Sequence, residues 1–360
     1  MKSLPQTERS MSETYDPVVI LGAGSWGTAL AISLALAGRR PILWTRRPEV
    51  AEYMQVNRRN PRYLSHIPLP ASIYITSDLE EAATAARTWT FAVPSHALRE
   101  VARQVQDFVS EKLLVISAAK GLEIATLKTS SQVLEEVLSS LPPERIGVLY
   151  GPSHAEEVAL GKPTAIVAAS RCEQTAEQIQ TTYMSERLRV YVNTDLIGVE
   201  IGGSVKNVIA IASGISDGAQ FGDNAKAALI TRGIAEIARL GILLGARPLT
   251  FAGLAGIGDL VATCTSRHSR NRYVGEQIAR GRKLQEILDE MKMVAEGVRT
   301  TRAVCKLARK YGIEMPISEG VYRVLFEDLD PVQGVRELMT RTPKREDWLA
   351  GLGEASAPSA

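Results

Sequence analysis

The sequence predicts an α/β protein in which a doubly wound sheet comes first and an all-α domain follows. Over residues 17–195, short apolar segments rich in β-branched residues alternate with helical patterns, as in strand-helix arrays. Past residue 195 only long helical patterns rich in small residues follow. The chain has 360 residues, which is long for one hydrophobic core. We therefore expect two domains, at 17–195 and 196–345, with flexible tails at 1–16 and 346–360.

The overall charge and the cysteines exclude several classes of protein. Lys and Arg number 42 against 40 Asp and Glu, so no global field attracts nucleic acid or a membrane surface. The most apolar window of the second half, Val205–Ile215, is interrupted by polar residues and is too short to span a bilayer. The three cysteines are far apart and show no metal-ligand spacing, which indicates a reducing, cytoplasmic setting without disulfides or a metal site: Cys172, Cys264 and Cys305.

The first strand and the first helix flank a glycine-rich turn. Val18–Leu21 is a short apolar strand, and an Ala- and Leu-rich helical pattern runs on to about Ala37. Between them lies G-x-G-x-x-G, in which Gly22 permits a sharp turn, Gly24 lets a pyrophosphate approach the backbone, and Gly27 lets the helix lie close on the sheet. The helix N-terminus offers N–H groups and a positive dipole end to a diphosphate. Strand, turn and helix occur in the required order, so the pattern predicts a Rossmann-type domain that binds a dinucleotide.

The second strand, Pro41–Trp44, ends where a Rossmann-type domain meets the adenosine ribose of its cofactor. An Asp or Glu at this point would bind the 2′-hydroxyl of NAD, and the sequence has neither. Arg46 and Arg47 stand there instead, and guanidinium groups suit a 2′-phosphate. This favours NADP(H), with NAD(H) possible. The alternative is a pair of arginines on a solvated turn.

The later strands each end in a loop that we expect at the ligand crevice. Lys120 follows the fifth strand among small residues, which favours projection into the crevice; the alternative is a solvated loop lysine. His96 follows Ser95, and we expect Ser95 to cap the next helix and His96 to begin it rather than to act as a catalyst. Gly151 and Ser153 follow the sixth strand, where they offer a backbone N–H and a hydroxyl to a small polar ligand. These strands are expected at 73–76, 88–93, 112–117, 145–150, 163–170 and 189–193.

The first helix of the second half contains two polar residues in an apolar stretch. Lys206 and Asn207 follow Gly202 and Gly203, so at least one of the two polar side chains faces a crevice or a buried partner. A desolvated lysine has a lowered pKa. Lowering that pKa from about 10.4 to roughly 7 to 8, as a general base needs, corresponds to about 3 to 4 kcal/mol. The alternative is a lysine that reaches solvent at a helix edge. Helices are predicted at 199–217, 225–244, 248–251 leading into 254–261, 270–279, 283–292, 296–311 and 316–326.

Two further stretches of the second half carry candidate binding groups. Asp259 lies on a glycine-flanked turn, where a carboxylate can orient an ammonium group or accept from a substrate hydroxyl; the alternative is a cap for the next helix. Ser269, Arg270 and Asn271 belong to a stretch with three arginines, several hydroxyls and an amide ahead of a helix. Such a set suits a phosphate or a carboxylate, whereas a bare charged run is often a solvated loop.

Ten short motifs follow one another over about residues 17–326. They are G-A-G-S-W-G-T-A-L (22–30), V-P-S-H (93–96), A-K-G-L-E (119–123), G-P-S-H-A (151–155), G-G-S-V-K-N-V-I-A-I (202–211), T-R-G (231–233), G-I-G-D-L (256–260), T-C-T-S (263–266), S-R-N (269–271) and V-A-E-G (294–297). Together they resemble the bacterial-type NAD(P)-dependent glycerol-3-phosphate dehydrogenases. The resemblance is more specific than any one motif because the motifs occur in the family's order. The segment from Asp328 onward carries none of them.

The resemblance implies a site, residue by residue. Lys206 matches the proton acceptor. The cofactor set comprises the glycines of the turn and the positions that match the family's: Gly22, Gly24, Ser25, Trp26, Gly27, Arg46, Arg47, Tyr63, Lys120, Ala155, Arg270, Val294 and Glu296. The substrate set matches positions that hold glycerol 3-phosphate or dihydroxyacetone phosphate: Lys120, Gly151, Ser153, Lys206, Asp259, Ser269, Arg270 and Asn271. Family members vary at Arg46 and Arg47, so the preference for NADP(H) rests on the physical argument above.

The resemblance also implies a reaction. It is reversible hydride transfer between NAD(P)H and dihydroxyacetone phosphate, giving sn-glycerol 3-phosphate for glycerophospholipid synthesis. Lys206 would exchange the proton of the C2 hydroxyl, Lys120 would polarise the carbonyl oxygen, and Asp259 would hold Lys206. Arg270 with Asn271 would bind the phosphate dianion.

Two other functions and the state of assembly stay open at this point. One alternative is a two-domain NADP-dependent dehydrogenase of hydroxy acids, in which Arg270 binds a carboxylate. The other is a non-catalytic protein that senses NADP(H), which would need no proton donor in the crevice. We expect a small-molecule substrate, no nucleic acid and no membrane insertion, and an all-α domain with apolar surface is compatible with a homodimer.

Overall fold

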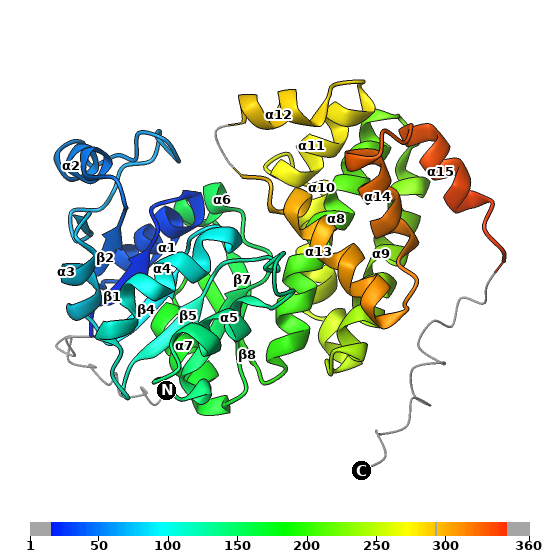
Figure 1. The fold of residues 1–360 in the computed structure, drawn as a ribbon. Helices are drawn as coiled ribbons and strands as arrows, with labels where there is room; N and C mark the ends of the chain where they lie inside the picture. Colours follow the sequence, from blue (N-terminus) through cyan, green and yellow to red (C-terminus); the bar gives the residue numbers. More distant parts are fainter. Residues whose placement is uncertain (1–15, 292–293, 344–360) are drawn as a thin grey trace, which may run out of the picture.

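The computed structural model describes residues 16–291 and 294–343. Within these residues eight strands form one sheet in the order β3-β2-β1-β4-β5-β6-β7-β8 (Figure 1). All of the predicted strands form, and their ends lie within two residues of the predicted ends. The expected tails at 1–16 and 346–360 lie, apart from Asp16, outside the described residues. The strands are β1 Val18–Leu21, β2 Pro41–Trp44, β3 Tyr74–Thr76, β4 Thr88–Phe91, β5 Leu114–Ser117, β6 Ile146–Tyr150, β7 Thr164–Ser170 and β8 Leu188–Asn193.

The direction of β7 differs from that of the other central strands. The first six strands are parallel to one another, as in a doubly wound sheet. β7 runs antiparallel to β6, and β8 runs parallel to β7. The connection from β6 to β7 contains only the five-residue helix α6, Ala155–Ala159. A helix of that length spans about 7.5 Å, which is too short to carry the chain back along a strand.

Both faces of the sheet are covered by helices, which explains why its strands are continuous apolar runs. In β1, Val18 and Ile20 pack into the cluster that contains residues of α1, α2, α6 and α7. Val19 and Leu21 point the other way, into the cluster with residues of α3, α4 and α5. The helices are α1 Ser25–Leu36, α2 Pro48–Asn57, α3 Leu79–Thr84, α4 Leu98–Val105, α5 Ser130–Val137, α6 as above and α7 Glu173–Tyr183.

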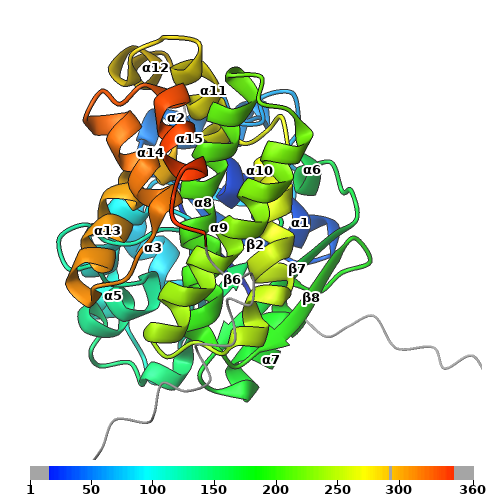
Figure 2. The same ribbon diagram turned by 90° about the vertical axis from the view of Figure 1, so that its right-hand side faces the viewer.

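The second half is helical, as predicted, and is built around α8, Leu196–Gly218 (Figure 2). This helix is long and apolar enough to cross a membrane by length and composition, so the judgement that this stretch is too short was wrong. Its most apolar window is 94% buried inside the protein, as in a core helix. The other helices are α9 Asp223–Leu243, α10 Asp259–Thr265, α11 Arg270–Ala279, α12 Leu284–Glu290, α13 Glu296–Tyr311, α14 Pro316–Phe326 and α15 Pro331–Met339, with short turns at Pro248–Ala252 and Leu254–Gly258.

Glycines let α8 and α11 approach until their backbones touch. A Cβ atom at Gly214 would lie 1.9 Å from the carbonyl oxygen of Arg272, and one at Gly275 would lie 2.0 Å from that of Ile211. Neither position can therefore hold a side chain without displacing a helix. This close packing brings the first residues of α11 beside the middle of α8, where the candidate catalytic lysine lies.

Candidate active site

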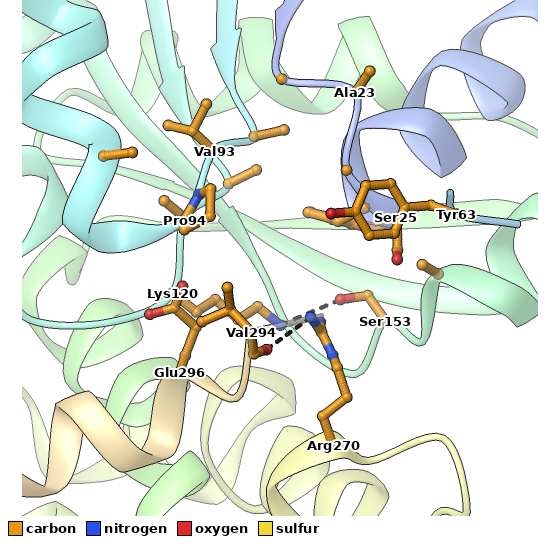
Figure 3. Close-up of a pocket in the computed structure, with 18 of the residues that line it drawn as sticks. Ala23, Ser25, Tyr63, Val93, Pro94, Lys120, Ser153, Arg270, Val294 and Glu296 are labelled. Carbon is orange, nitrogen blue, oxygen red and sulfur yellow. Dashed lines mark hydrogen bonds between the residues drawn. The ribbon is translucent and has the colours of Figure 1, made fainter. Parts of the chain in front are cut away.

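A cleft of about 460 Å³ runs between the carboxyl edge of the sheet and the helical half. Its walls come from the loops after β1, β2, β4, β5 and β6, and from α8, α10, α11 and the segment that leads into α13. The carboxyl edge is where parallel α/β sheets bind their ligands. Figure 3 shows side chains from both halves that face this cleft, including Ser25, Lys120, Arg270 and Glu296.

The cleft brings nearly all of the predicted site residues together. Two of them, Gly27 and Gly151, do not line it. Gly27 packs closely against the strand-helix turn, since a Cβ atom there would lie 1.9 Å from the carbonyl oxygen of Gly22. Gly151 contributes through its carbonyl oxygen, which accepts a hydrogen bond from Lys120. The predicted residues that line the cleft are Gly22, Gly24, Ser25, Trp26, Arg46, Arg47, Tyr63, Lys120, Ser153, Ala155, Lys206, Asp259, Ser269, Arg270, Asn271, Val294 and Glu296.

The glycine-rich turn has the shape that a dinucleotide pyrophosphate needs. Gly22 has a φ of 121°, a conformation that residues with a side chain rarely adopt. A Cβ atom at Gly24 would meet no atom within 4 Å, so the turn leaves open space in front of its backbone. No side chain caps the N-terminus of α1. The indole Nε1 of Trp26 is buried at the cleft wall without a hydrogen-bond partner. These features fit a bound dinucleotide.

Asn60 organises this part of the cleft, and sequence reasoning missed it. Its Nδ2 donates to the carbonyl oxygen of Ala23 (3.0 Å) and to the hydroxyl of Thr28 (2.9 Å). Its Oδ1 accepts from the backbone N–H groups of Arg62 and Tyr63. Asn60 therefore ties the loop that carries Tyr63 to the glycine-rich turn. No local sequence pattern marks its link to the glycine-rich turn, because Ala23 and Thr28, which accept from its Nδ2, lie more than thirty residues away.

Two lysines and one aspartate meet at the base of the cleft. Lys206 Nζ lies 2.5 Å from Asp259 Oδ1, and Lys120 Nζ lies 2.9 Å from Asp259 Oδ2. Lys120 also donates to the carbonyl oxygen of Gly151 (2.8 Å). It donates as well to the hydroxyl of Ser153 (3.2 Å), as Figure 3 shows. The Asp259 side chain is only 2% exposed, so one carboxylate holds two ammonium groups in a nearly dry environment.

Different elements position the three charged groups. Lys206 projects from the middle of α8, Lys120 from the loop after β5, and Asp259 from the first turn of α10. The turn before α10 has a non-helical residue, Gly256, which lets the chain bend into α10. Thr263 lies one turn after Asp259 and accepts from Lys206 Nζ at 2.6 Å. Its spacing of four residues from Asp259 is the sequence signal that could have found it.

Burial and charge shift the pKa values of this cluster. Burial lowers the pKa of Lys206 to about 8, with Asp259 opposing the shift and Lys120 adding to it. Burial pushes the pKa of Asp259 upward, but the charges of Lys120 and Lys206 outweigh it and hold this pKa below the usual value. Near neutral pH, Lys206 can therefore give or take a proton while Asp259 stays ionised.

The start of α11 forms the other end of the cleft. Ser269 caps α11 by accepting from the backbone N–H of Arg272. Arg270 Nη1 donates to the carbonyl oxygen of Val294 (2.9 Å) (Figure 3). Asn271 Oδ1 accepts from the backbone N–H of Gly297 (2.9 Å), so α11 and the start of α13 are joined here.

Asn207 also belongs to this end of the cleft, although the sequence only singled it out as one member of a polar pair. Its Oδ1 accepts from Asn271 Nδ2 at 2.9 Å, which leaves its own Nδ2 as a donor. Asn207 lines the cleft beside Lys206. The sequence signal that could have identified Asn207 as a site residue is its position next to a candidate catalytic lysine in an apolar helix.

The fold and the cleft define a two-domain dehydrogenase that uses a dinucleotide. Models of the NAD-dependent glycerol-3-phosphate dehydrogenase N-terminus and C-terminus match residues 17–176 and 195–336. The chain therefore belongs to the NAD-dependent glycerol-3-phosphate dehydrogenase family, as the motifs predicted.

Individual relatives agree with this assignment. The chain is 60% identical to glycerol-3-phosphate dehydrogenase [NAD(P)+] 2 of Salinibacter ruber, over 92% of this chain and 96% of that one. It is 53% identical to glycerol-3-phosphate dehydrogenase [NAD(P)+] of Chlorobium phaeobacteroides, over 91% and 98%. The crystal structure of glycerol-3-phosphate dehydrogenase from Coxiella burnetii superposes with a TM-score of 0.87 at 41% identity, covering 91% of this chain and all of that one. These relatives support the main expectation and neither of the two alternatives.

Proposed function

We propose that this protein is an NAD(P)-dependent sn-glycerol-3-phosphate dehydrogenase that interconverts dihydroxyacetone phosphate and sn-glycerol 3-phosphate. The observation that carries the proposal is the Lys120–Asp259–Lys206 cluster, which lies in one cleft with the glycine-rich turn and the start of α11. The cleft thus contains a turn suited to a dinucleotide, a lysine that can exchange a proton, and a helix N-terminus suited to an anion. We infer that the product serves glycerophospholipid synthesis in the cytoplasm.

The cofactor would lie along the carboxyl edge of the sheet. The open backbone at Gly24 and the start of α1, with Ser25 and Trp26, suit its pyrophosphate. Arg46 and Arg47 line the cleft beyond β2, where the adenosine ribose belongs. The remaining proposed cofactor contacts are Tyr63, Lys120, Ala155, Arg270, Val294 and Glu296. The bound nicotinamide would exchange a hydride with C2 of the substrate.

Lys206 would handle the proton of the C2 hydroxyl. With a pKa of about 8 it is partly neutral under mildly alkaline conditions and can accept this proton when glycerol 3-phosphate is oxidised. In its protonated form it donates the same proton to the oxygen when the ketone is reduced. Thr263 and Asp259 fix the Nζ atom from two sides, so the lysine is oriented before substrate arrives.

Lys120 and Asp259 would set the charge around the reacting oxygen. Lys120 is a fixed positive charge close to Lys206, suited to stabilise negative charge that develops on the substrate oxygen. Asp259 keeps both ammonium groups in place and prevents their repulsion from opening the site. The Gly151 carbonyl and the Ser153 hydroxyl complete the shell of Lys120.

The phosphate of the substrate would lie at the start of α11. Arg270 supplies a guanidinium group, Asn271 and Asn207 supply amides, and the helix end itself favours an anion. Ser269 holds this turn in shape through its cap. Asn207 connects this end of the cleft with the lysines. It is the neighbour of Lys206 on α8, and it is hydrogen-bonded to Asn271.

The direct test of the proposal compares substrates. Initial rates of NADPH and NADH oxidation are measured with dihydroxyacetone phosphate and with 2-keto acids of similar size. We expect turnover with dihydroxyacetone phosphate and none with the keto acids. Preferred turnover of a keto acid would replace the proposal by a hydroxy acid dehydrogenase.

The pH dependence of the reaction follows from Lys206. Oxidation needs neutral Lys206, so kcat for glycerol 3-phosphate is expected to rise with pH through a midpoint near 8. Reduction needs the protonated form, so kcat for dihydroxyacetone phosphate is expected to fall through the same midpoint. The profiles are measured at saturating cofactor and substrate. If kcat changed with pH in the same sense for oxidation and for reduction, Lys206 could not be the shared acid and base.

The cofactor preference depends on Arg46 and Arg47. Replacing both by alanine is expected to raise KM for NADPH by about 10- to 100-fold, because charge-assisted bonds to the 2′-phosphate are lost. KM for NADH should change much less, since NADH lacks that phosphate. Arg103→Ala, an exposed arginine on α4, is the control. Equal changes for NADPH and NADH would contradict the assignment.

A further inference from the structure

Ser95 and Glu296 connect the two halves of the protein beside the cleft. The backbone N–H of Ser95 donates to Glu296 Oε1 (3.2 Å), and the Ser95 hydroxyl donates to Glu296 Oε2 (2.6 Å). Ser95 lies in the short 3-10 turn after β4, and Glu296 is the first residue of α13. One serine thus occupies both oxygens of a carboxylate that belongs to the other half of the chain. We call this pair the Ser95–Glu296 clasp.

The prediction that Ser95 caps the helix after β4 was wrong. The serine does not cap the helix that follows β4, because no side chain caps that turn and the residue before the turn is Pro94. Its hydroxyl is bound to Glu296 instead. The V-P-S-H motif therefore contributes a contact between the two halves.

The loop after β5 packs directly against the clasp. A Cβ atom at Gly121 would lie 2.7 Å from the Ser95 hydroxyl oxygen and 3.4 Å from Glu296 Oε2. Gly121 follows Lys120, so the clasp lies beside the loop that presents a proposed catalytic lysine. Only a residue without a side chain leaves room for the serine and the carboxylate together.

Ser95 does not itself line the cleft, whereas Glu296 and the neighbours of Ser95, Pro94 and His96, do. Each oxygen of Glu296 accepts one bond from Ser95 and has a further lone pair to accept from a ligand hydroxyl or amide. Figure 3 shows Val294 and Glu296 close to Pro94 and Lys120 in the cleft. We therefore expect the Ser95 side chain to act on a ligand through Glu296, its hydrogen-bond partner.

The geometry points to Ser95 as a positioning residue for the cofactor. We propose that the clasp aims the Glu296 carboxylate into the cleft and holds the start of α13 against the dinucleotide-binding half. This inference rests on the proposed function, because it takes the ligand of the cleft to be NAD(P)(H). The segment from Val294 to Glu296 is held at its other end by Arg270, within the helical half. The clasp is thus its anchor to the dinucleotide-binding half.

The first test measures NADPH binding to Ser95→Ala by fluorescence titration of the full-length protein. Loss of a hydrogen bond to a charged group is expected to weaken NADPH binding by about tenfold. Ser95→Thr keeps the hydroxyl and should restore most of the affinity, while Ser110→Ala, at an exposed position, should bind like the parent protein. At saturating NADPH, KM for dihydroxyacetone phosphate should stay close to that of the parent protein. Unchanged NADPH binding in Ser95→Ala, or equal losses in Ser95→Ala and Ser95→Thr, would overturn the proposal.

A double-mutant cycle tests whether Ser95 acts through Glu296. Glu296→Ala removes the acceptor, so adding Ser95→Ala to it should weaken NADPH binding no further. Additive losses would show that Ser95 acts on the cofactor by another route and would overturn the proposal. Because these experiments measure binding, they are independent of turnover. A parent protein that binds NADPH but does not reduce dihydroxyacetone phosphate would refute the proposed function and leave the clasp testable.

Discussion

Lys206→Ala is expected to lower kcat by about 10²- to 10⁴-fold in both directions, because the variant loses the group that exchanges the substrate proton. KM for dihydroxyacetone phosphate should change much less, since the phosphate-binding end at Arg270 and Asn271 is untouched. Steady-state kinetics at saturating NADPH separate the two quantities. The environment supports this role, because burial brings the pKa of Lys206 to about 8 while Thr263 and Asp259 fix its position.

A second substitution separates proton transfer from charge. Lys206→Arg keeps the positive charge, but a guanidinium group does not deprotonate in this pH range, so this variant should be nearly as slow as Lys206→Ala. Lys162→Ala removes a lysine whose side chain is 58% exposed and should leave kinetics unchanged. Near-normal turnover with unchanged substrate affinity in Lys206→Ala would disprove the assignment.

Asp259→Asn is expected to reduce both stability and activity. It leaves the ammonium groups of Lys120 and Lys206 close together without their shared counter-ion. Removing one partner of a buried ion pair costs on the order of 3–5 kcal/mol of unfolding free energy. Activity should fall as well, because the carboxylate that orients both lysines is gone. Denaturant unfolding and NADPH-dependent rates measure the two effects.

The stability loss in Asp259→Asn should depend on pH. Asp259 raises the pKa of Lys206, so the variant's folded-state pKa lies below the parent's value of about 8. Folded Lys206 then binds fewer protons than unfolded Lys206 over the range from that lowered pKa up to the unfolded value. Between the lowered pKa and about 8, rising pH therefore stabilises the variant but not the parent, because the parent's folded Lys206 is still protonated there. The deficit of the variant should shrink as pH rises toward about 8 and stay constant above it. Asp107→Asn, at an exposed position, is the matched control; a deficit independent of pH would contradict the argument.

Much of the fold was predictable because its signals are local. The strand-helix alternation and the G-x-G-x-x-G turn place β1, α1 and the cofactor edge without any knowledge of distant contacts. The antiparallel course of β7 was not predicted, since it depends on the shortness of α6 rather than on the strand itself. No element was predicted at α15, although Asp330 caps it and Pro331 begins it, the usual signals of a helix start.

The candidate site was predictable where a residue type conflicts with its surroundings. Lys206 stood out because a charged group lies in an apolar helix, whereas its contact with Asp259 was expected only from the resemblance to the dehydrogenase family. Asn60 and the Ser95–Glu296 clasp could not be found this way. The acceptors of the Asn60 amide group and the partner of Ser95 come from remote segments, and a serine or an asparagine in a loop is common.

The central claim is that this cleft moves hydrogen between the nicotinamide C4 and the substrate C2 while Lys206 supplies the proton. Its most direct test is reduction of dihydroxyacetone phosphate with NADPH that carries deuterium at both C4 positions. The account predicts glycerol 3-phosphate with one deuterium, at C2, and no such product from Lys206→Ala on the same time scale. Product without deuterium at C2, or equally rapid labelling by Lys206→Ala, would contradict it.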